Sequence, residues 1–273
     1  MMNLYDKLEF TDVSDGVSYA AFNGYAGLMS EMLDDERVTI PHLNAALEIA
    51  MMRDHRFVVM ELLADGRVDP TLNDNQCIRY AVFSGYTNIV KILLEDRRAD
   101  PCVENNLIFR HAVWHGYVEI VKMLLKDGRA DPTVNNNFAL AKACEHDHDA
   151  LVEALIFDGR ADPSIKNNML IAYAAEYLHS DSVAKLLKDP RVDPGANNNY
   201  ALVQASKCWR LTTIGLLLPY CGHMIGMHDY NEIKQYLSAD VEAIWLNCLT
   251  TNALMVRLVV EKHLCIDLWH RMC

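Results

Sequence analysis

The chain repeats one pattern with a constant 31-residue period along most of its length. The dipeptide Asp-Pro occurs five times at this spacing, first at positions 69–70 and last at positions 193–194, and an arginine stands two positions before each aspartate. The same frame fixes one alanine and one asparagine per unit, namely Ala81, Ala112, Ala143, Ala174, Ala205 and Asn75, Asn106, Asn137, Asn168, Asn199. A constant period of this length predicts a stack of small units, each of which buries its apolar face against its neighbours.

Each unit contains two segments with apolar residues at helical spacing. Residues 139–145 and 150–157 show this pattern in one unit. In other units the two segments are separated by Gly85 or Gly116, and glycine suits the left-handed conformation that closes a helix. The second segment, IVKILL at residues 89–94, is apolar on two faces and is therefore expected to pack between neighbouring units. The sequence predicts an all-α fold of short helix pairs.

The asparagine-rich patches precede the first helix of each unit. The second helix must be over before each Asp-Pro, because proline lacks an N–H group and keeps the preceding residue out of helical geometry. Asparagine then follows, as at residues 135–137, where it tolerates positive φ and can cap free N–H groups. We expect Asn137 and its equivalents to be the N-caps of the first helices. An asparagine ladder that binds a ligand or metal is the alternative.

The arginine before each Asp-Pro also has two interpretations. Stacking would align Arg129 and Asp131 with their equivalents in rows, which predicts a ladder of ion pairs between repeats. Exposed pairs of this kind contribute less than about 1 kcal/mol each. A basic strip that meets an acidic partner is the alternative.

These motifs resemble the ankyrin repeat. The resemblance rests on a first helix of form N-x-A-L-x-x-A, a second helix of form G-x-x-x-I-V-K-x-L-L and a turn ending in A-D, and it covers residues 15–222. It implies an all-α, ankyrin-type helical solenoid of about seven to eight repeats. The period is shorter than the family's usual period of about 33 residues, which predicts short turns or minimal hairpins before the first helices. This N-x-A-L and R-x-D-P variant resembles the ankyrin arrays of giant DNA viruses of amoebae and of some protists.

The register divides the chain into three parts. Residues 1–38 are expected to form an N-terminal capping repeat, residues 39–222 the ankyrin-like repeats with their 31-residue period, and residues 223–273 a degenerate repeat with C-terminal capping helices. Atypical end units are needed because an open stack would otherwise expose the apolar face of its last repeat.

Composition excludes several classes of partner. The formal charge of −12 repels nucleic acid and anionic lipid. The longest apolar runs fall far short of the roughly 20 residues of a membrane span, and the N-terminal residues resemble neither a secretory signal nor a transit peptide. The eight cysteines show no paired spacing, which argues against a disulfide framework or a zinc ribbon. We expect a cytoplasmic protein (in the host cytoplasm if the source is viral) that binds neither nucleic acid nor membrane.

The sequence carries no motif for catalysis. It has no glycine-rich phosphate loop and no nucleophile elbow. His111 and His115 are four positions apart, but Ala112 stands where a metalloprotease has glutamate, so a solvent-facing or aromatic-packed pair is expected instead of a zinc site. The acidic run at residues 145–149 is expected to be a solvated turn. We therefore expect no enzyme activity, no metal and no cofactor.

The resemblance implies a protein–protein interaction module that binds a partner protein on its concave face. Positions just before each helix break differ between repeats while the framework residues stay fixed, and this contrast separates recognition from architecture. The candidate partner-binding residues are Phe83, Trp114, His115, Glu145, His146, Glu176, Tyr177, Lys207, Phe138 and Tyr200. Such aromatic and acidic side chains suit a partner with basic and apolar contact residues. Packing of Trp114 and Tyr177 on adjacent first helices is the alternative.

A substrate adaptor of a ubiquitin ligase is the second functional hypothesis. In this hypothesis the repeats hold a target and residues 223–273 recruit the ligase. Residues 231–237, NEIKQYL, faintly resemble the start of an F-box-like helix, although the preceding Leu-Pro is missing.

Overall fold

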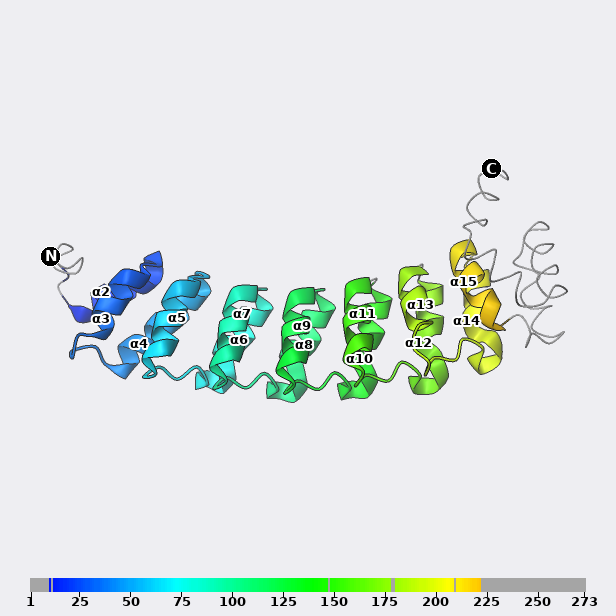
Figure 1. The fold of residues 1–273 in the computed structure, drawn as a ribbon. Coiled ribbons are helices and arrows are strands. Elements are labelled where there is room, and N and C mark those ends of the chain that lie inside the picture. The colour runs from blue at the N-terminus through cyan, green and yellow to red at the C-terminus, as the bar shows by residue number, and fades with distance from the viewer. Residues whose placement is uncertain (1–9, 11, 147, 178–179, 209, 222–273) are drawn as a thin grey trace, which may run out of the picture. The chain divides into compact units, whose positions relative to one another are not determined.

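The computed structural model describes residues 10, 12–146, 148–177, 180–208 and 210–221, which form helix pairs (Figure 1). The pairs are α2 (Val13–Asn23) with α3 (Ala26–Leu33), α4 (Ile40–Met52) with α5 (Arg56–Asp65), α6 (Leu72–Phe83) with α7 (Thr87–Asp96), α8 (Val103–Trp114) with α9 (Val118–Asp127), α10 (Val134–Glu145) with α11 (Asp149–Asp158), α12 (Ile165–Glu176) with α13 (Ser180–Leu186), and α14 (Ala196–Lys207) with α15 (Leu211–Cys221). These residues contain no strand, so the predicted all-α solenoid with short turns is confirmed. The recruiting segment at residues 231–237 and the expected C-terminal caps lie outside the described residues.

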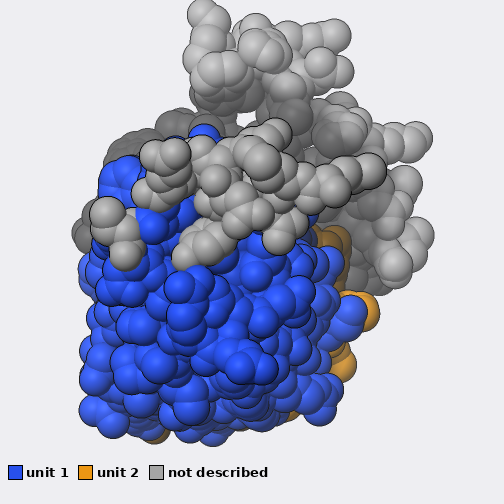
Figure 2. Space-filling view, turned by 90° about the vertical axis from the view of Figure 1, so that its left-hand side faces the viewer, with its two compact units in different colours: residues 1–131 blue, residues 132–273 orange. Residues whose placement is uncertain are grey.

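The chain divides into two compact units, residues 1–131 and residues 132–273, which Figure 2 colours separately. In unit 1 the first helices α2, α4, α6 and α8 pack side by side in one layer, and the second helices α3, α5, α7 and α9 pack in another. Unit 2 has the same two layers, with α10, α12 and α14 in the first and α11, α13 and α15 in the second. The first-helix layer and the second-helix layer therefore each present one outer face to solvent.

The invariant alanines lie on the buried sides of the first helices. All five are completely buried, from Ala81 to Ala205. The second helices bury both of the apolar faces seen in the sequence, as Ile89, Val90 and Leu93 of α7 show. The repeated frame therefore marks the buried positions of each helix, where a closely packed interior leaves little room for a larger side chain.

The helix breaks have the predicted left-handed geometry. Gly85 and Gly116 have φ values of 72° and 70°. A Cβ atom at Gly85 would lie 3.2 Å from Cζ of Tyr117 in the next repeat, so glycine is required both by its conformation and by this close approach.

The asparagine patches form a left-handed turn of three residues. Asn135, Asn136 and Asn137 have φ values of 54°, 56° and 55°, and each other unit from α6 to α14 has the same turn. The right-handed helix begins only after the third residue. Asparagine tolerates this conformation better than other residues with a side chain, which explains its recurrence.

The expectation that Asn137 and its equivalents are N-caps is wrong. The Oδ1 atom of Asn137 accepts a hydrogen bond from the backbone N–H of Asp162 in the next repeat, at 3.2 Å. The equivalent bonds join Asn44 to Asp69, Asn75 to Asp100, Asn106 to Asp131 and Asn168 to Asp193. An N-cap has extended backbone geometry, whereas Asn137 is left-handed. The asparagines therefore connect successive repeats.

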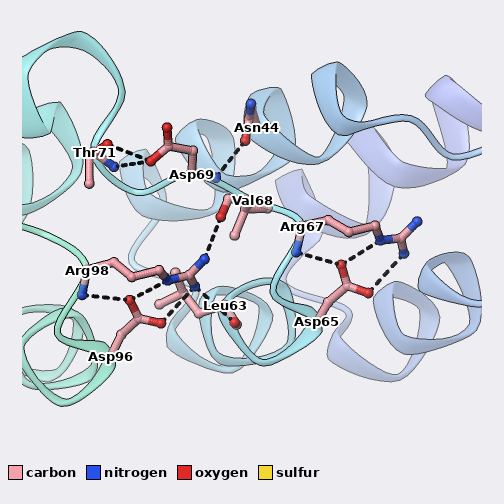
Figure 3. Close-up of polar contacts among 9 residues, drawn as sticks. All are labelled: Asn44, Leu63, Asp65, Arg67, Val68, Asp69, Thr71, Asp96 and Arg98. Atoms are coloured by element: carbon pink, nitrogen blue, oxygen red, sulfur yellow. Dashed lines mark hydrogen bonds and ion pairs between the residues drawn. The ribbon is translucent and has the colours of Figure 1, made fainter.

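The expected ladder of ion pairs between repeats is also wrong. Each arginine pairs with the aspartate two positions before it in its own repeat, as for Arg98, whose Nε is 2.8 Å from Oδ1 of Asp96 (Figure 3). The guanidinium group reaches the preceding repeat through backbone carbonyls instead, donating to Val68 at 2.7 Å and to Leu63 at 3.1 Å. Leu63 lies in the last turn of α5, where carbonyl groups lack helical partners and favour a cation. The arginines therefore bridge repeats without forming ion pairs across them.

The aspartates of the Asp-Pro dipeptides stabilise the turn instead. The Asp69 carboxylate accepts hydrogen bonds from the backbone N–H of Thr71, at 2.9 Å, and from its hydroxyl group, at 2.6 Å. Asp162 and Ser164 repeat this arrangement. A turn in which an aspartate side chain accepts a hydrogen bond from the backbone N–H two residues later is an Asx turn. Because the Asp-Pro aspartate is engaged in this turn, the arginine two positions before it pairs with the preceding aspartate of the same repeat instead.

These pairs predict acid sensitivity. Hydrogen bonds from arginine lower the pKa of Asp127 and of Asp189, and that of Asp35 falls from 3.8 to about 2. The folded state therefore favours the charged carboxylates, and their stabilisation is complete above the ordinary aspartate pKa and is lost as the pH falls through the lowered pKa values. We expect the free energy of unfolding, measured by urea titration at a series of pH values, to decrease between about pH 4 and pH 2. The pairs of Asp127 and Asp189 should each contribute less than about 1 kcal/mol to this decrease, because their arginines are solvated.

The variant Asp127→Asn provides the control for this expectation. It removes one titrating pair and should make the decrease below about pH 4 shallower. An equally steep decrease in this variant would show that the Asp127–Arg129 pair does not contribute.

Candidate functional site

The predicted contact residues lie on the first-helix layer, at the ends of its helices. Phe83, Trp114, Glu145, Glu176 and Lys207 are the last residues of α6, α8, α10, α12 and α14, respectively. His115, His146 and Tyr177 are the C-cap residues that follow α8, α10 and α12. Each unit thus presents one row of variable side chains along the outer edge of its first helices. We call the positions equivalent to Trp114 the Trp114 row.

Phe138 and Tyr200 form a second row on the same helices. Phe138 precedes Glu145 by seven positions, and Tyr200 precedes Lys207 by the same distance. This separation is about two helical turns, so each pair lies on one face of its helix. Both aromatic side chains are half-buried, and they extend the variable surface from the helix ends toward the left-handed turns.

The large aromatic residues of these rows are well exposed. Trp114 is 47% exposed and Tyr177 is 50% exposed. His115 and His146 are also exposed, whereas Glu145, Glu176 and Lys207 are half-buried. Trp114 and Tyr177 therefore do not belong to the core, although part of each ring rests on the protein.

Two histidines stack with aromatic residues beside Trp114. The ring centroid of His111 lies 4.4 Å from that of Phe83 on the preceding first helix and 4.0 Å from that of His115. Nδ1 of His115 lies 3.0 Å from the carbonyl oxygen of His111. Burial, with a smaller effect of His115, lowers the pKa of His111. The expected aromatic-packed pair is confirmed, and the described residues contain no cluster of three potential metal ligands.

In unit 2 the corresponding surface is charged. Glu145 forms an ion pair with Lys142 one turn earlier on α10, and Nζ of Lys142 lies 5.8 Å from the ring centroid of Phe138. The aromatic ring, the amine and the carboxylate therefore lie together along one side of α10. This surface can accept both apolar and charged groups of a partner.

Sequence reasoning missed two members of the Trp114 row. Phe22 on α2 and Met52 on α4 occupy the same repeat position as Phe83 and Trp114, and both are about half exposed. Phe22 was obscured because a 30-residue step, instead of the 31-residue step of the frame, separates the left-handed helix breaks at Gly24 and Asp54. Met52 keeps the regular 31-residue step to Phe83 and could have been found by extending the frame upstream.

The helices in the described part of the chain are too short, or not apolar enough, for a membrane span.

Comparisons with known proteins agree with this architecture. The ankyrin repeat family model matches residues 76–106, and a model of three ankyrin repeats matches residues 109–200. Among solved structures, the crystal structure of EF0377, an ankyrin repeat protein, matches with a TM-score of 0.52 and 24% identity, over 66% of this chain and 99% of that chain. Comparison with curated proteins found no significant match. The family models thus place ankyrin repeats at residues 76–106 and 109–200, and the paired helices and the 31-residue frame continue the same architecture in the described residues outside these matches.

Proposed function

We propose that this protein binds a partner protein through the exposed face of its first-helix layer. Ankyrin repeats in general act as protein–protein interaction modules. The observation that carries the proposal is the contrast between the buried, invariant alanines and the variable Trp114 row, where aromatic side chains are half exposed. Large aromatic residues exposed in a row are typical of interaction surfaces. The first-helix layer is therefore the recognition surface and the alanine frame is its scaffold.

The partner in this proposal presents apolar contact residues to unit 1 and basic contact residues to unit 2. Phe83 and Trp114 offer apolar anchor points in unit 1, and Glu145 and Glu176 offer carboxylates in unit 2. Charges at the edge of an interface act mainly on the association rate. Raising the salt concentration should accordingly slow association more than it speeds dissociation.

We propose a non-catalytic role in the cytoplasm. Support for the first part comes from the sequence, in which aspartates and arginines that recur in every repeat serve the architecture. Support for the location comes from the cysteines, which have no paired spacing. Cys77 and Cys144 are free and buried, and burial raises the pKa of their thiols to about 11 and about 12, so both stay protonated at neutral pH.

Site-specific photo-crosslinking tests the proposed surface. A benzophenone amino acid would replace Trp114 or Tyr177 on the first-helix layer, or Phe57 of α5 as the control on the second-helix layer, which is 56% exposed. We expect one partner to be crosslinked from positions 114 and 177 and not from position 57. Equal crosslinking from Phe57, or crosslinking from that position alone, would move the site to the second-helix layer.

Truncation of the aromatic side chains should then separate binding from folding. We expect Trp114→Ala and Tyr177→Ala each to weaken binding of that partner at least tenfold, which corresponds to about 1.4 kcal/mol. The melting temperature should stay within a few degrees because both side chains are half exposed. Isothermal titration calorimetry and thermal unfolding measure the two effects, with Phe57→Ala as the matched control. A strongly destabilised Trp114→Ala protein, or undiminished binding by both variants, would contradict the proposal.

A further inference from the structure

The Trp114 row is apolar throughout unit 1. Its four members there, Phe22, Met52, Phe83 and Trp114, are 48%, 51%, 37% and 47% exposed. They occupy equivalent positions on α2, α4, α6 and α8, which pack side by side in the first-helix layer. In unit 2 the same position holds Glu145, Glu176 and Lys207. The apolar row is therefore a local property of unit 1 and is not required by the repeat frame.

Positive charge flanks this row. Arg79 and Arg110 stand four positions before Phe83 and Trp114, one turn earlier on the same faces of α6 and α8. A third arginine contacts the row directly, because the guanidinium carbon of Arg53 lies 3.6 Å from the ring centroid of Phe22.

Acidic groups neutralise these arginines only in part. Arg79 pairs at 3.1 Å with Glu104, whose side chain is half exposed, and Arg110 forms no ion pair among the described residues. Glu48 is the acidic residue at the position equivalent to Arg79 and Arg110. In a chain of net charge −12, a strip with three arginines and two glutamates keeps a net positive charge and is complementary to an acidic ligand.

The spacing of the row matches that of a helix with one apolar residue per heptad. Packed helices lie about 8–10 Å apart, so the row repeats at about that distance. One heptad of an α-helix rises about 10.5 Å. About three residues of an extended chain span about 10 Å, so spacing alone admits both conformations of a ligand.

Backbone hydrogen bonding distinguishes these two ligands. An extended peptide carries free N–H and C=O groups and binds best where a strand edge can pair with them. The face of unit 1 is made of helix side chains, and its described residues contain no strand. A helical ligand satisfies its own backbone groups and needs only side-chain contacts. The surface therefore favours a helix.

We propose that the apolar row of unit 1 seats an amphipathic helix of the partner, with one large apolar residue per heptad and acidic residues facing Arg79 and Arg110. This inference rests on the proposed function and specifies the ligand of the same surface. The ligand helix lies across α2, α4, α6 and α8, with its apolar residues between successive members of the row. The flexible Met52 side chain accommodates the small difference between the two spacings.

Synthetic peptides and the full-length protein test this proposal. The probe is a fluorescein-labelled peptide of four heptads with one leucine per heptad and glutamates flanking the leucines on one side. A second peptide has the same composition with the leucines distributed around the helix, and a third has lysine in place of glutamate. A fourth has leucine at every third position with prolines between, which holds it extended. We expect the first peptide to bind at least tenfold more tightly than each of the others and to gain helicity on binding.

Protein variants locate the binding site of the peptide. Met52→Glu should weaken binding of the first peptide at least tenfold, whereas Met60→Glu on α5, which is similarly exposed, should leave it unchanged. Met52→Ala serves the same purpose if the charged variant folds poorly, with a smaller loss. Arg110→Gln should reduce the preference for the glutamate peptide over the lysine peptide.

Three results would overturn the inference. They are tighter binding of the extended peptide, binding of the heptad peptide that Met52→Glu leaves intact, and no binding at peptide concentrations up to about 1 mM.

Failure of this inference is distinguishable from failure of the proposed function. If the crosslinked partner depends on Trp114 while the heptad peptide does not bind, the surface is correct and the helical ligand is wrong. If Trp114→Ala and Tyr177→Ala both bind the partner as tightly as the unchanged protein does, the proposed surface itself is wrong.

Discussion

Asn137→Ala is expected to lower the free energy of unfolding by about 1.5 to 3.5 kcal/mol. Two effects add in this value. Alanine in the left-handed region costs about 1–2 kcal/mol, and Asn137 has a φ of 55°. The backbone N–H of Asp162 also loses its acceptor, and a hydrogen bond of this kind contributes about 0.5–1.5 kcal/mol net. Urea unfolding monitored by circular dichroism measures the total.

Two further variants separate these effects. Asn137→Gly keeps the left-handed geometry and removes only the hydrogen bond, so it should cost less than Asn137→Ala. Asn136→Ala keeps that bond and changes a neighbouring residue that is exposed and equally left-handed, with a φ of 56°. It should cost only the conformational part, about 1–2 kcal/mol. If Asn136→Ala were as damaging as Asn137→Ala, the bond between repeats would contribute nothing.

Ala143→Leu is expected to destabilise the protein by about 1 to 3 kcal/mol through overpacking. Ala143 is completely buried on α10, which packs against α11 within its repeat and against α12 in the next. A leucine there adds three carbon atoms at the contact and forces the helices apart or into strained rotamers. The midpoint of urea unfolding should fall accordingly.

Ala150→Leu is the matched control for that substitution. Ala150 lies on α11 and is exposed, so leucine there keeps helix propensity and meets no neighbouring helix. Its effect should remain within about 0.5 kcal/mol of zero. Equal stability of the two variants would mean that the alanine register does not mark the contact between helices.

The helix pairs could be predicted from the sequence because their signals are local and repeated. Apolar spacing gives each helix, the Asp-Pro dipeptide requires the second helix to end before it, and five copies of the pattern remove the ambiguity of any single segment. Gly85 and Gly116 indicated left-handed breaks for the same reason. The completely buried alanines followed from the frame without knowledge of their neighbours.

The connections between repeats could not be predicted as well. An asparagine before a helix suggests an N-cap, and nothing in the pattern near Asn137 reveals that three successive residues turn left-handed. For the arginines a usable signal existed. Asp127 precedes Arg129 by two positions and recurs with the same period as Asp131, but sequence alone did not show which aspartate lies within reach of the guanidinium group.

The candidate site could also be predicted only in part from the sequence. Trp114 and Tyr177 stood out because variable positions are recognisable against a fixed frame, and the structure leaves both half exposed. The continuity of the row from Phe22 to Trp114 depends on which helices are neighbours, and the shift to a 30-residue step between Gly24 and Asp54 hid its first member. The positive charge beside the row could likewise not be predicted, because only the packing of α6 and α8 shows that Arg79 and Arg110 lie next to it.

The asparagine bonds have a consequence for how such a chain can change its length during evolution. Each bond spans the same sequence separation of 25, from one repeat to the next, and the bond recurs in five successive repeats, from the one that contains Asn44 to the one that contains Asn168. Duplication or loss of one complete 31-residue segment therefore leaves every remaining asparagine with an aspartate N–H at the correct distance along the chain. A change of any other length breaks one junction. Gene-level expansion in whole segments can thus lengthen the recognition surface without redesigning its scaffold.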